Sequence, residues 1–100
     1  MLNQVILVGR LTNKPILEEK GDKVYSKVTL AIPRNYKNIN GEYDIDYIDV
    51  VLFNKIAQSC VEYCEQGDII SVRGNLQRLK DKDLEVYAKK ITFLSSGLNK

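Results

Sequence analysis

The chain has 100 residues, of which 44% are hydrophobic and 28% charged, and it contains no histidine and no tryptophan. These are ordinary values for one globular domain, which is long enough to bury a real core without disulfides or metals. The net charge of +2 and the isoelectric point near 8.5 are only mildly basic. Bulk charge therefore does not identify a nucleic-acid binder, and any polyanion site must come from how the basic residues are arranged.

The two cysteines, Cys60 and Cys64, are expected to be free thiols on the apolar face of a helix. A zinc site within one chain would lack nitrogen and sulfur ligands because there is no histidine. Reduced, buried thiols are typical of the cytoplasm. The sequence shows neither a signal peptide nor a run of about 20 apolar residues that could span a membrane. We therefore expect a cytoplasmic protein without cofactor or metal.

The first expected strand covers residues 3–11, and Pro15 stops its hydrogen-bond ladder. Gly9 inside this strand indicates a bulge or a sharp bend. The segment EKGDK is expected to form a turn, and a second strand follows it. One face of the second strand carries Val24, Ser26, Val28, Leu30 and Ile32, and the other carries Tyr25, Lys27, Thr29 and Ala31.

The polar segment PRNYKNINGEYD reads as a hairpin loop with arms that can extend, and Gly41 is its expected turn residue. The third strand covers residues 47–53, where β-branched and aromatic residues dominate. One face carries the aliphatic residues Ile48, Val50 and Leu52, and the other carries Tyr47, Asp49, Val51 and Phe53. The aspartate indicates that this second face meets water or a partner, together with two aromatic rings six residues apart.

A helix is expected over residues 54–66, with Gly67 just beyond its end. Its apolar stripe consists of Ile56, Ala57, Cys60, Val61 and Cys64. The fourth strand covers residues 68–79, the charged segment KDKD forms a tight turn, and the fifth strand covers residues 84–94. Five short strands with a helix between the third and the fourth predict an all-β fold, a five-stranded OB-fold barrel. Residues 1–100 are expected to be a single domain, with a folded core at about 3–94 and a short polar tail at 95–100.

Four segments carry a family resemblance in one register: MLNQVILVGRLTNKP, VTLAIPRNYKNINGEYDIDYIDVVLFNKIA, YCEQGDIISVRGNLQ and ITFL. They are similar to the bacterial single-stranded DNA-binding protein family over nearly the whole chain. The resemblance implies an OB-fold that assembles into homotetramers and binds single-stranded DNA without sequence preference. It further implies a role in replication, recombination, repair or DNA uptake.

The resemblance also implies particular binding residues. The family stacks bases on aromatic rings at the positions of Tyr36, Tyr47 and Phe53, and it has a basic residue at Lys55. Our own interpretation agrees for Tyr47 and Phe53, because both leave the core face. Further cations expected to line the groove and reach phosphate are Arg34, Lys37, Arg73, Arg78 and Lys80. A positive groove with interleaved aromatic rings is what unspecific single-strand binding requires.

Other interpretations of these residues stay open. Tyr47 and Phe53 could pack against another subunit, and Tyr36 could be an ordinary hairpin residue. Tyr63 is interpreted as a packing residue of the helix, whereas Tyr25 and Tyr87 are left undecided. Single Lys and Arg residues are more often solvated surface than contacts, and only their company with the aromatic rings favours a binding role.

The chain departs from the family pattern in three ways. The segment RLKDKDLE is short and lacks the aromatic residue that many members carry there, which predicts a smaller footprint on DNA. Tyr and Phe replace Trp, so stacking should be somewhat weaker. The chain stops at SSGLNK, without the flexible linker and acidic tail through which the family recruits partners. We therefore expect a short form whose recruitment of replication and repair proteins is doubtful.

Two functions from other classes compete with DNA binding. An OB-type primosome or protein-interaction module with weak nucleic-acid binding would place the aromatic rings in an interface. The second alternative is an enzyme or an RNA-binding accessory domain. An enzyme is disfavoured because the chain has no histidine for acid–base chemistry and no glycine-rich phosphate loop. Asp44, Asp46 and Asp49 could suggest a metal cluster, but Asp46 and Asp49 should point to opposite faces of a strand.

Overall fold

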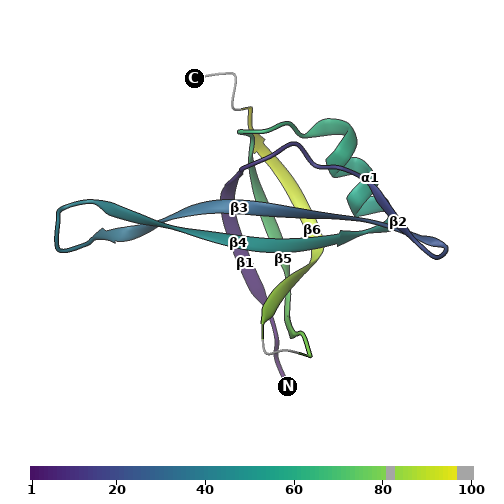
Figure 1. Cartoon of the computed structure of the whole chain (residues 1–100), viewed down its shortest axis with the longest axis horizontal. Coiled ribbons are helices and arrows are strands. Elements are labelled where there is room, and N and C mark those ends of the chain that lie inside the picture. The colour runs from purple at the N-terminus through teal and green to yellow at the C-terminus, as the bar shows by residue number, and fades with distance from the viewer. Residues whose placement is uncertain (81–82, 97–100) are drawn as a thin grey trace.

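The strands of this protein close into a barrel, in a computed structural model that describes residues 1–80 and 83–96 (Figure 1). The elements are β1 (Val5–Leu11), β2 (Glu18–Lys20), β3 (Lys23–Lys37), β4 (Tyr43–Phe53), α1 (Asn54–Tyr63), β5 (Ile69–Arg78) and β6 (Leu84–Ser95). The sheet order is β1-β5-β6-β4-β3-β2, and an additional β1–β3 pairing closes it. The five barrel strands and the helix after β4 confirm the predicted all-β OB-fold.

The pairing between β4 and β6 completes the barrel wall and is the parallel contact within it. It is short, with Val50 opposite Val86 and Val51 opposite Tyr87. The other pairings, β1–β3, β1–β5, β2–β3, β3–β4 and β5–β6, are antiparallel. Residues far apart in the sequence, at the ends of β4 and β6, are therefore brought side by side.

Two glycines let the strands approach closely enough to curl. At Gly74 the β5–β6 register shifts, so this glycine lies at an irregularity of the strand. A Cβ atom on Gly74 would overlap the carbonyl oxygen of Tyr87 and would lie 2.8 Å from its carbonyl carbon. At Gly9 the β1–β5 register runs on without a shift, so this glycine does not mark a bulge. It serves close approach instead, because a Cβ atom there would lie 2.8 Å from Cγ1 of Ile32.

The core lies inside the barrel and under α1. Its fully buried members include Val28 and Leu30 from β3, Val50 and Leu52 from β4, and Ile70 and Val72 from β5. In β3 and β4 these are the inward positions predicted by alternation. From the helical stripe, Ala57, Cys60 and Cys64 are buried, and burial raises the pKa of the Cys60 thiol to about 12. The helix therefore plugs one end of the barrel against β3, β4 and β6.

The helix ends at Tyr63, three residues before the predicted end at Gln66. Tyr63 itself is 70% exposed, so the interpretation of its ring as a packing residue was wrong. The backbone of Cys64 is extended, although its N–H still donates to the carbonyl oxygen of Cys60 at 3.0 Å. The side chain of Asp68 accepts a hydrogen bond from the N–H of Glu65 at 2.9 Å, which favours a turn over another helical residue. Gly67 supplies the positive φ of 94° that this turn needs.

The predicted loop at residues 33–44 is largely strand. The strands β3 and β4 continue into a two-stranded arm that reaches away from the barrel at the left of Figure 1. A register shift between Pro33 and Lys37 interrupts the arm. At its tip, the Oδ1 atom of Asn38 accepts hydrogen bonds from the N–H groups of Asn40 at 2.8 Å and Glu42 at 3.0 Å. These hydrogen bonds to the Asn38 side chain confine the turn to a few residues, so the two strands of the arm stay paired up to its tip.

The remaining differences lie at segment ends. The segment EKGDK contains a short strand, because β2 pairs antiparallel with the start of β3. The strand β6 runs to Ser95, so the predicted tail begins later than residue 95. Residues 81–82 of the predicted KDKD turn and residues 97–100 of the predicted tail lie outside the described residues. In residues 1–80 and 83–96, no helix is long and apolar enough to cross a membrane.

Candidate nucleic-acid interface

The outer face of β4 carries the two aromatic rings that the sequence pattern placed there. Tyr47 is 64% exposed and Phe53 is 38% exposed, whereas their strand neighbours Val50 and Leu52 are buried. The prediction for Val51 was wrong in one respect. It shares the outer face with Tyr47 and Phe53, yet it is only 6% exposed and offers no free surface. Side chains from the two neighbouring strands cover it.

Phe53 lies at the centre of a cluster of three rings. Its ring centroid is 6.3 Å from that of Tyr25 on β3 and 5.9 Å from that of Tyr87 on β6. The planes of the Phe53 and Tyr87 rings differ by only 19°. Pairing places Tyr25 opposite Phe53, and Tyr87 opposite Val51. Alternation had already put Tyr25 on the outer face of its strand. No sequence signal placed Tyr87 beside Phe53, because the parallel β4–β6 contact joins distant segments.

The three rings border a hollow of about 320 Å³. Its other lining residues are Lys20, Lys27, Val51, Leu79 and Glu85. The Nζ atom of Lys27 lies 2.8 Å from Oε2 of Glu85, so an ion pair reaches from β3 to β6 across Val51. Glu85 is only 7% exposed. The hydrogen bond to Glu85 raises the pKa of Lys27. The pKa of Tyr87 is raised mainly by desolvation and next by the nearby carboxylate of Glu85.

The three predicted stacking residues are spread along one ribbon instead of being gathered in one pocket. Phe53 ends β4 on the barrel, Tyr47 pairs with Ala31 further along, and the 60% exposed Tyr36 lies on the arm. A strand rises about 3.3 Å per residue, so Tyr47 and Phe53 are about 20 Å apart. Tyr43, also exposed on the arm, has the ammonium group of Lys37 5.9 Å from its ring centroid.

Arg34 is engaged by carboxylates of the same arm. Its Nε and Nη2 atoms donate to Asp46 at 3.1 and 3.0 Å, and Nη1 lies 3.8 Å from Asp44. This hydrogen bonding raises the pKa of Arg34 and lowers that of Asp46. Asp49 accepts a hydrogen bond from Thr29 at 2.8 Å. Within the described ranges, no three His, Cys, Asp or Glu residues are grouped so that they could hold a metal ion.

The other predicted cations fall into two regions. Arg78 and Lys80 are the sequence neighbours of Leu79, which lines the aromatic hollow, but neither of them lines it. Lys55 lies in the first turn of α1, directly after Phe53, where Asn54 turns the chain with a positive φ of 54°. Arg73 lies on β5 opposite Ile6 of β1 and Lys90 of β6. Arg73 therefore faces a different side of the barrel from the three rings.

Two lysines that the sequence pattern did not single out join Lys55 and Arg73. Lys55, Lys89 and Lys90 line one hollow, and Arg73 and Lys90 line the next. Adjacent strand residues normally face opposite sides. Here the register shift at Gly74 gives β6 an extra residue, so Lys89 and Lys90 are both exposed. Gly74 in the sequence signals an irregular strand, but only the pairing with β6 shows which two lysines it exposes.

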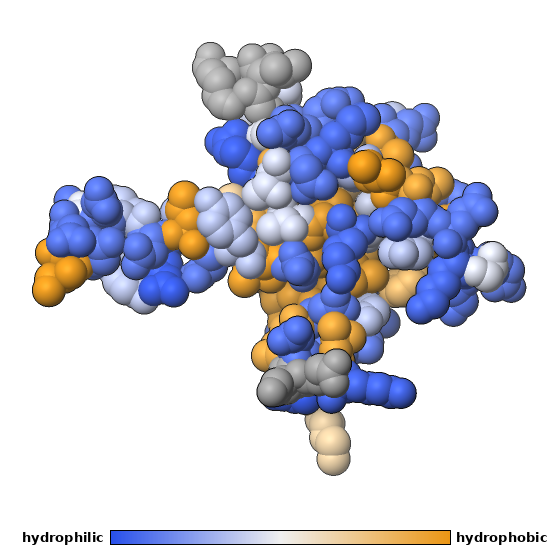
Figure 2. Space-filling model, viewed as in Figure 1, coloured by the Kyte–Doolittle hydropathy of each residue, from blue (hydrophilic) through white to orange (hydrophobic). Residues whose placement is uncertain are grey.

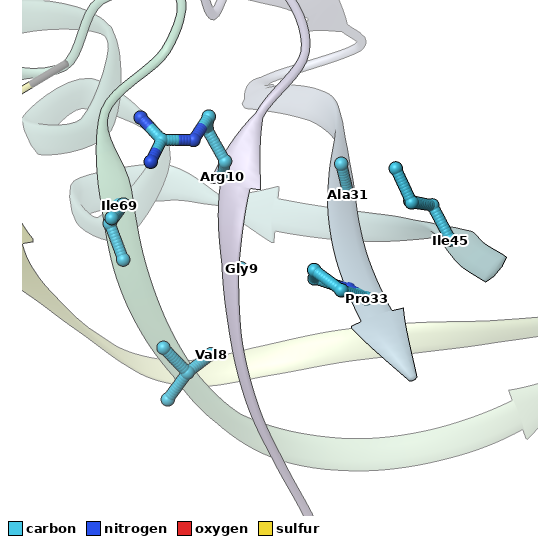
Figure 3. Close-up of a pocket in the computed structure, with 7 residues that line it drawn as sticks. All are labelled: Val8, Gly9, Arg10, Ala31, Pro33, Ile45 and Ile69. Carbon is cyan, nitrogen blue, oxygen red and sulfur yellow. The ribbon is translucent and has the colours of Figure 1, made fainter. Parts of the chain in front are cut away.

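A further hollow, of about 360 Å³, lies between β1 and the β3–β4 ribbon (Figure 3). Its lining is mostly apolar: Val8, Gly9, Arg10, Ala31, Pro33, Ile45 and Ile69. In Figure 2 hydrophobic residues show at the centre of the barrel, whereas hydrophilic residues dominate the arm and the helical end. None of the nine residues predicted to contact nucleic acid lines this hollow, and its apolar character does not suit a polyanion.

The molecule is thus an OB-fold with aromatic rings and cations along its second and third barrel strands, and comparison with known proteins identifies the family. The sequence model of the Single-strand binding protein family matches residues 2–94. The chain belongs to this family. The recognition made from the four sequence segments is thereby confirmed.

Several curated members of the single-strand binding family are similar over most of the chain. Single-stranded DNA-binding protein 1 of Streptococcus pyogenes is 39% identical over 89 residues, which are 87% of this chain and 68% of that protein. Single-stranded DNA-binding protein B of Bacillus subtilis is 41% identical over 78 residues, covering 77% of this chain and 69% of that protein. Single-stranded DNA-binding protein 2 of Streptococcus agalactiae serotype III is 38% identical over 104 residues, covering 96% and 79%.

Proposed function

We propose that this chain binds single-stranded DNA without sequence preference, by stacking bases on aromatic rings. The observation that carries the proposal is the ribbon β3–β4, whose outer face presents Phe53 and Tyr47 and whose arm carries the exposed Tyr36 further along. The outer face of the second and third strands of an OB-fold is the usual oligonucleotide surface. Every base has a π-face, so such stacking tolerates any sequence. The names of the similar proteins agree with this function.

The bound DNA strand is proposed to run along the β3–β4 ribbon, from the barrel end towards the arm. Lys55 lies two residues after Phe53, and Arg78 and Lys80 adjoin in the sequence Leu79 of the aromatic hollow, so these cations are proposed to meet phosphates near Phe53. Lys37 on the arm adds a further charge. Arg34 contributes less, because Asp46 and Asp44 already offset its charge. Arg73 is proposed to act with Lys89 and Lys90, away from the rings.

The proposal is a binding function and not a catalytic one, and it serves the protection of single strands in replication, recombination, repair or DNA uptake. The chain is proposed to act in the cytoplasm, where its two buried, free cysteines stay reduced. A protein-interaction module remains the alternative function. Failure of the folded chain to bind single strands would favour it.

Salt dependence tests the electrostatic part of the proposal. The logarithm of the affinity for oligo-dT should fall linearly with the logarithm of the salt concentration, by about 0.7 for each phosphate neutralised. Lys55→Gln should lower this slope by about 0.7, because one phosphate contact is removed. Lys14→Gln is the control, since Lys14 lies by the end of α1, 2.8 Å from Glu65. An affinity that does not depend on salt would contradict phosphate binding.

Self-association is proposed to occur through β1. Ile6 and Val8 are 64% and 50% exposed, and Val8 borders the apolar hollow of Figure 3. Among the described residues, the β1–β3 pairing involves only Arg10 and Leu11, so residues 5–9 present one strand edge without a partner. Such edges pair readily with another chain. A homo-oligomer, in our proposal a homotetramer, would cover this surface.

The oligomer is expected to be visible as mass in solution. Light scattering at micromolar concentration should give a multiple of the 11.4 kDa chain mass. Val8→Lys should shift the distribution towards smaller species, because a charge would be placed in the proposed contact. Ile39→Lys, at an exposed site on the tip of the arm, should leave the mass unchanged. A monomer for the unsubstituted chain would contradict the proposal.

A further inference from the structure

We propose that Tyr25, Phe53 and Tyr87 form a single base-binding platform, so that the site at Phe53 is made of three rings from three strands. The inference rests on the proposed function and deepens it, because it assigns nucleotide contacts to two tyrosines that had no role. Its ligand class is a nucleobase of a single strand, together with the phosphate attached to it.

The position of the rings supports a ligand site. All three rings lie on the outside of the barrel, where the floor between them is Val51, and Phe53 remains 38% exposed. The centroid distances of 6.3 and 5.9 Å make the cluster continuous. A base laid on Phe53 would therefore extend over a neighbouring ring as well. Offset contacts between aromatic systems are favourable beyond the area that they bury.

The hollow beside the rings has suitable size and chemistry. Its volume of about 320 Å³ is at the small end of the range for small-molecule sites, which suits one or two bases but not a folded partner. Lys20 and Lys27 line it, as does the carboxylate of Glu85. The 2.8 Å ion pair with Lys27 offsets the Glu85 charge, so a phosphate meets no uncompensated anion here. Lys20 then adds a positive charge to the lining of the hollow.

The Lys27–Glu85 pair keeps the floor of the platform in place. Lys27 comes from β3 and Glu85 from β6, and both flank Val51 of β4. The hydroxyl of Tyr87 also lies within 3.4 Å of Oε1 of Glu85, which restrains its ring. The ion pair thus links β3 and β6 across β4, the strand that carries the central ring. Such pre-ordering lowers the cost of arranging the rings when a base binds.

The rings could instead serve only to support the short parallel contact between β4 and β6. That role and the binding role differ in what each substitution does. Tyr87→Phe retains the ring, whereas Tyr87→Leu retains apolar volume and loses the π-face. A merely structural ring would show its loss in stability alone. A binding ring would show it in the affinity of properly folded protein.

The experiment compares Tyr87→Leu, Tyr87→Phe and the control Tyr63→Leu, which removes a 70% exposed ring from α1. The affinity for oligo-dT and the thermal unfolding midpoint are measured for each variant. Tyr87→Leu is expected to bind at least about 5-fold more weakly, the lower end of the loss of one stacked base. Tyr87→Phe and Tyr63→Leu should bind like the unsubstituted chain. Equal affinities for Tyr87→Leu and the control would overturn the platform.

Photocrosslinking makes the result independent of stability. An oligo-dT that carries 5-iodouracil is irradiated with the unsubstituted protein, and the crosslinked peptides are sequenced by mass spectrometry. Crosslinks on Tyr25 or Tyr87 are expected. Crosslinks confined to Tyr36, Tyr47 and Phe53 would overturn the platform and leave the proposed function standing. Absence of both binding and crosslinks would overturn the two together.

Discussion

Gly74→Ala is expected to destabilise the protein strongly, although it adds only one methyl group. The added Cβ atom would overlap the carbonyl oxygen of Tyr87 and lie 2.8 Å from its carbonyl carbon, both in the paired strand β6. Backbone cannot turn aside as a side chain can, so β5 and β6 would have to separate at the bulge. Overpacking usually costs 1–3 kcal/mol, and we expect about 3 kcal/mol or more of unfolding free energy. Urea unfolding measures it.

Gly21→Ala is the matched control for this experiment. Gly21 lies in the turn before β3 with a φ of 64°, and nothing lies within 4 Å of where its Cβ would be. Only the left-handed backbone opposes this substitution, which should cost about 1–2 kcal/mol. If Gly74→Ala proved no less stable than Gly21→Ala, the close approach of β5 and β6 at Gly74 would be wrong. The curled barrel wall that positions Tyr87 would then be in question.

Phe53→Ala is expected to have the largest effect on DNA binding. Phe53 is the central ring of its cluster and the first ring of the ribbon, and it lies two residues before Lys55. Loss of one stacked base costs about 1–3 kcal/mol, which corresponds to an affinity about 5- to 150-fold weaker for oligo-dT. Tyr47→Ala should fall in the same range, as an independent site about 20 Å away. Fluorescence or calorimetric titration measures both.

Two controls separate stacking from stability. Phe53→Leu keeps apolar contact with Tyr25 and Tyr87 but removes the π-face. It should therefore bind oligo-dT almost as weakly as Phe53→Ala, but unfold at a higher urea concentration than Phe53→Ala. Tyr63→Ala removes an exposed ring from α1 and should leave the affinity unchanged. Full affinity in a folded Phe53→Leu variant would show that an apolar surface suffices there, and the stacking assignment would fail.

Much of the fold could be predicted because the core strands alternate clearly. Val28, Leu30, Val50 and Leu52 occupy inward positions as the pattern indicated, and the helical stripe is buried at Ala57, Cys60 and Cys64. What alternation cannot give is pairing. The closing β1–β3 contact, the parallel β4–β6 contact and the strand β2 all depend on residues outside the strand's own pattern. Hydrogen bonds from backbone N–H groups to two side chains also changed the predicted boundaries. The bond to Asp68 favours an earlier end of α1, and the bond to Asn38 shortens the loop between β3 and β4.

The candidate site was predictable in kind but only partly in composition. An outward face with Tyr47 and Phe53 follows from strand period alone. The burial of Val51 does not, because the side chains that cover it come from β3 and β6. The engagement of Arg34 by Asp46 likewise arises from cross-strand geometry, with Ile32 opposite Asp46. The roles in binding stay predictions for all nine residues: Tyr36, Tyr47, Phe53, Lys55, Arg34, Lys37, Arg73, Arg78 and Lys80.

The central claim is that the unsubstituted chain binds single strands through exposed aromatic rings. The chain has six tyrosines and no tryptophan, so its tyrosine fluorescence reports directly on such stacking. The decisive measurement is a titration with oligo-dT and with a duplex of equal length, at one fixed low salt concentration. We predict saturable quenching by oligo-dT and much weaker binding of the duplex. Fluorescence unchanged by oligo-dT together with no binding, or equal affinity for the duplex, would contradict the claim.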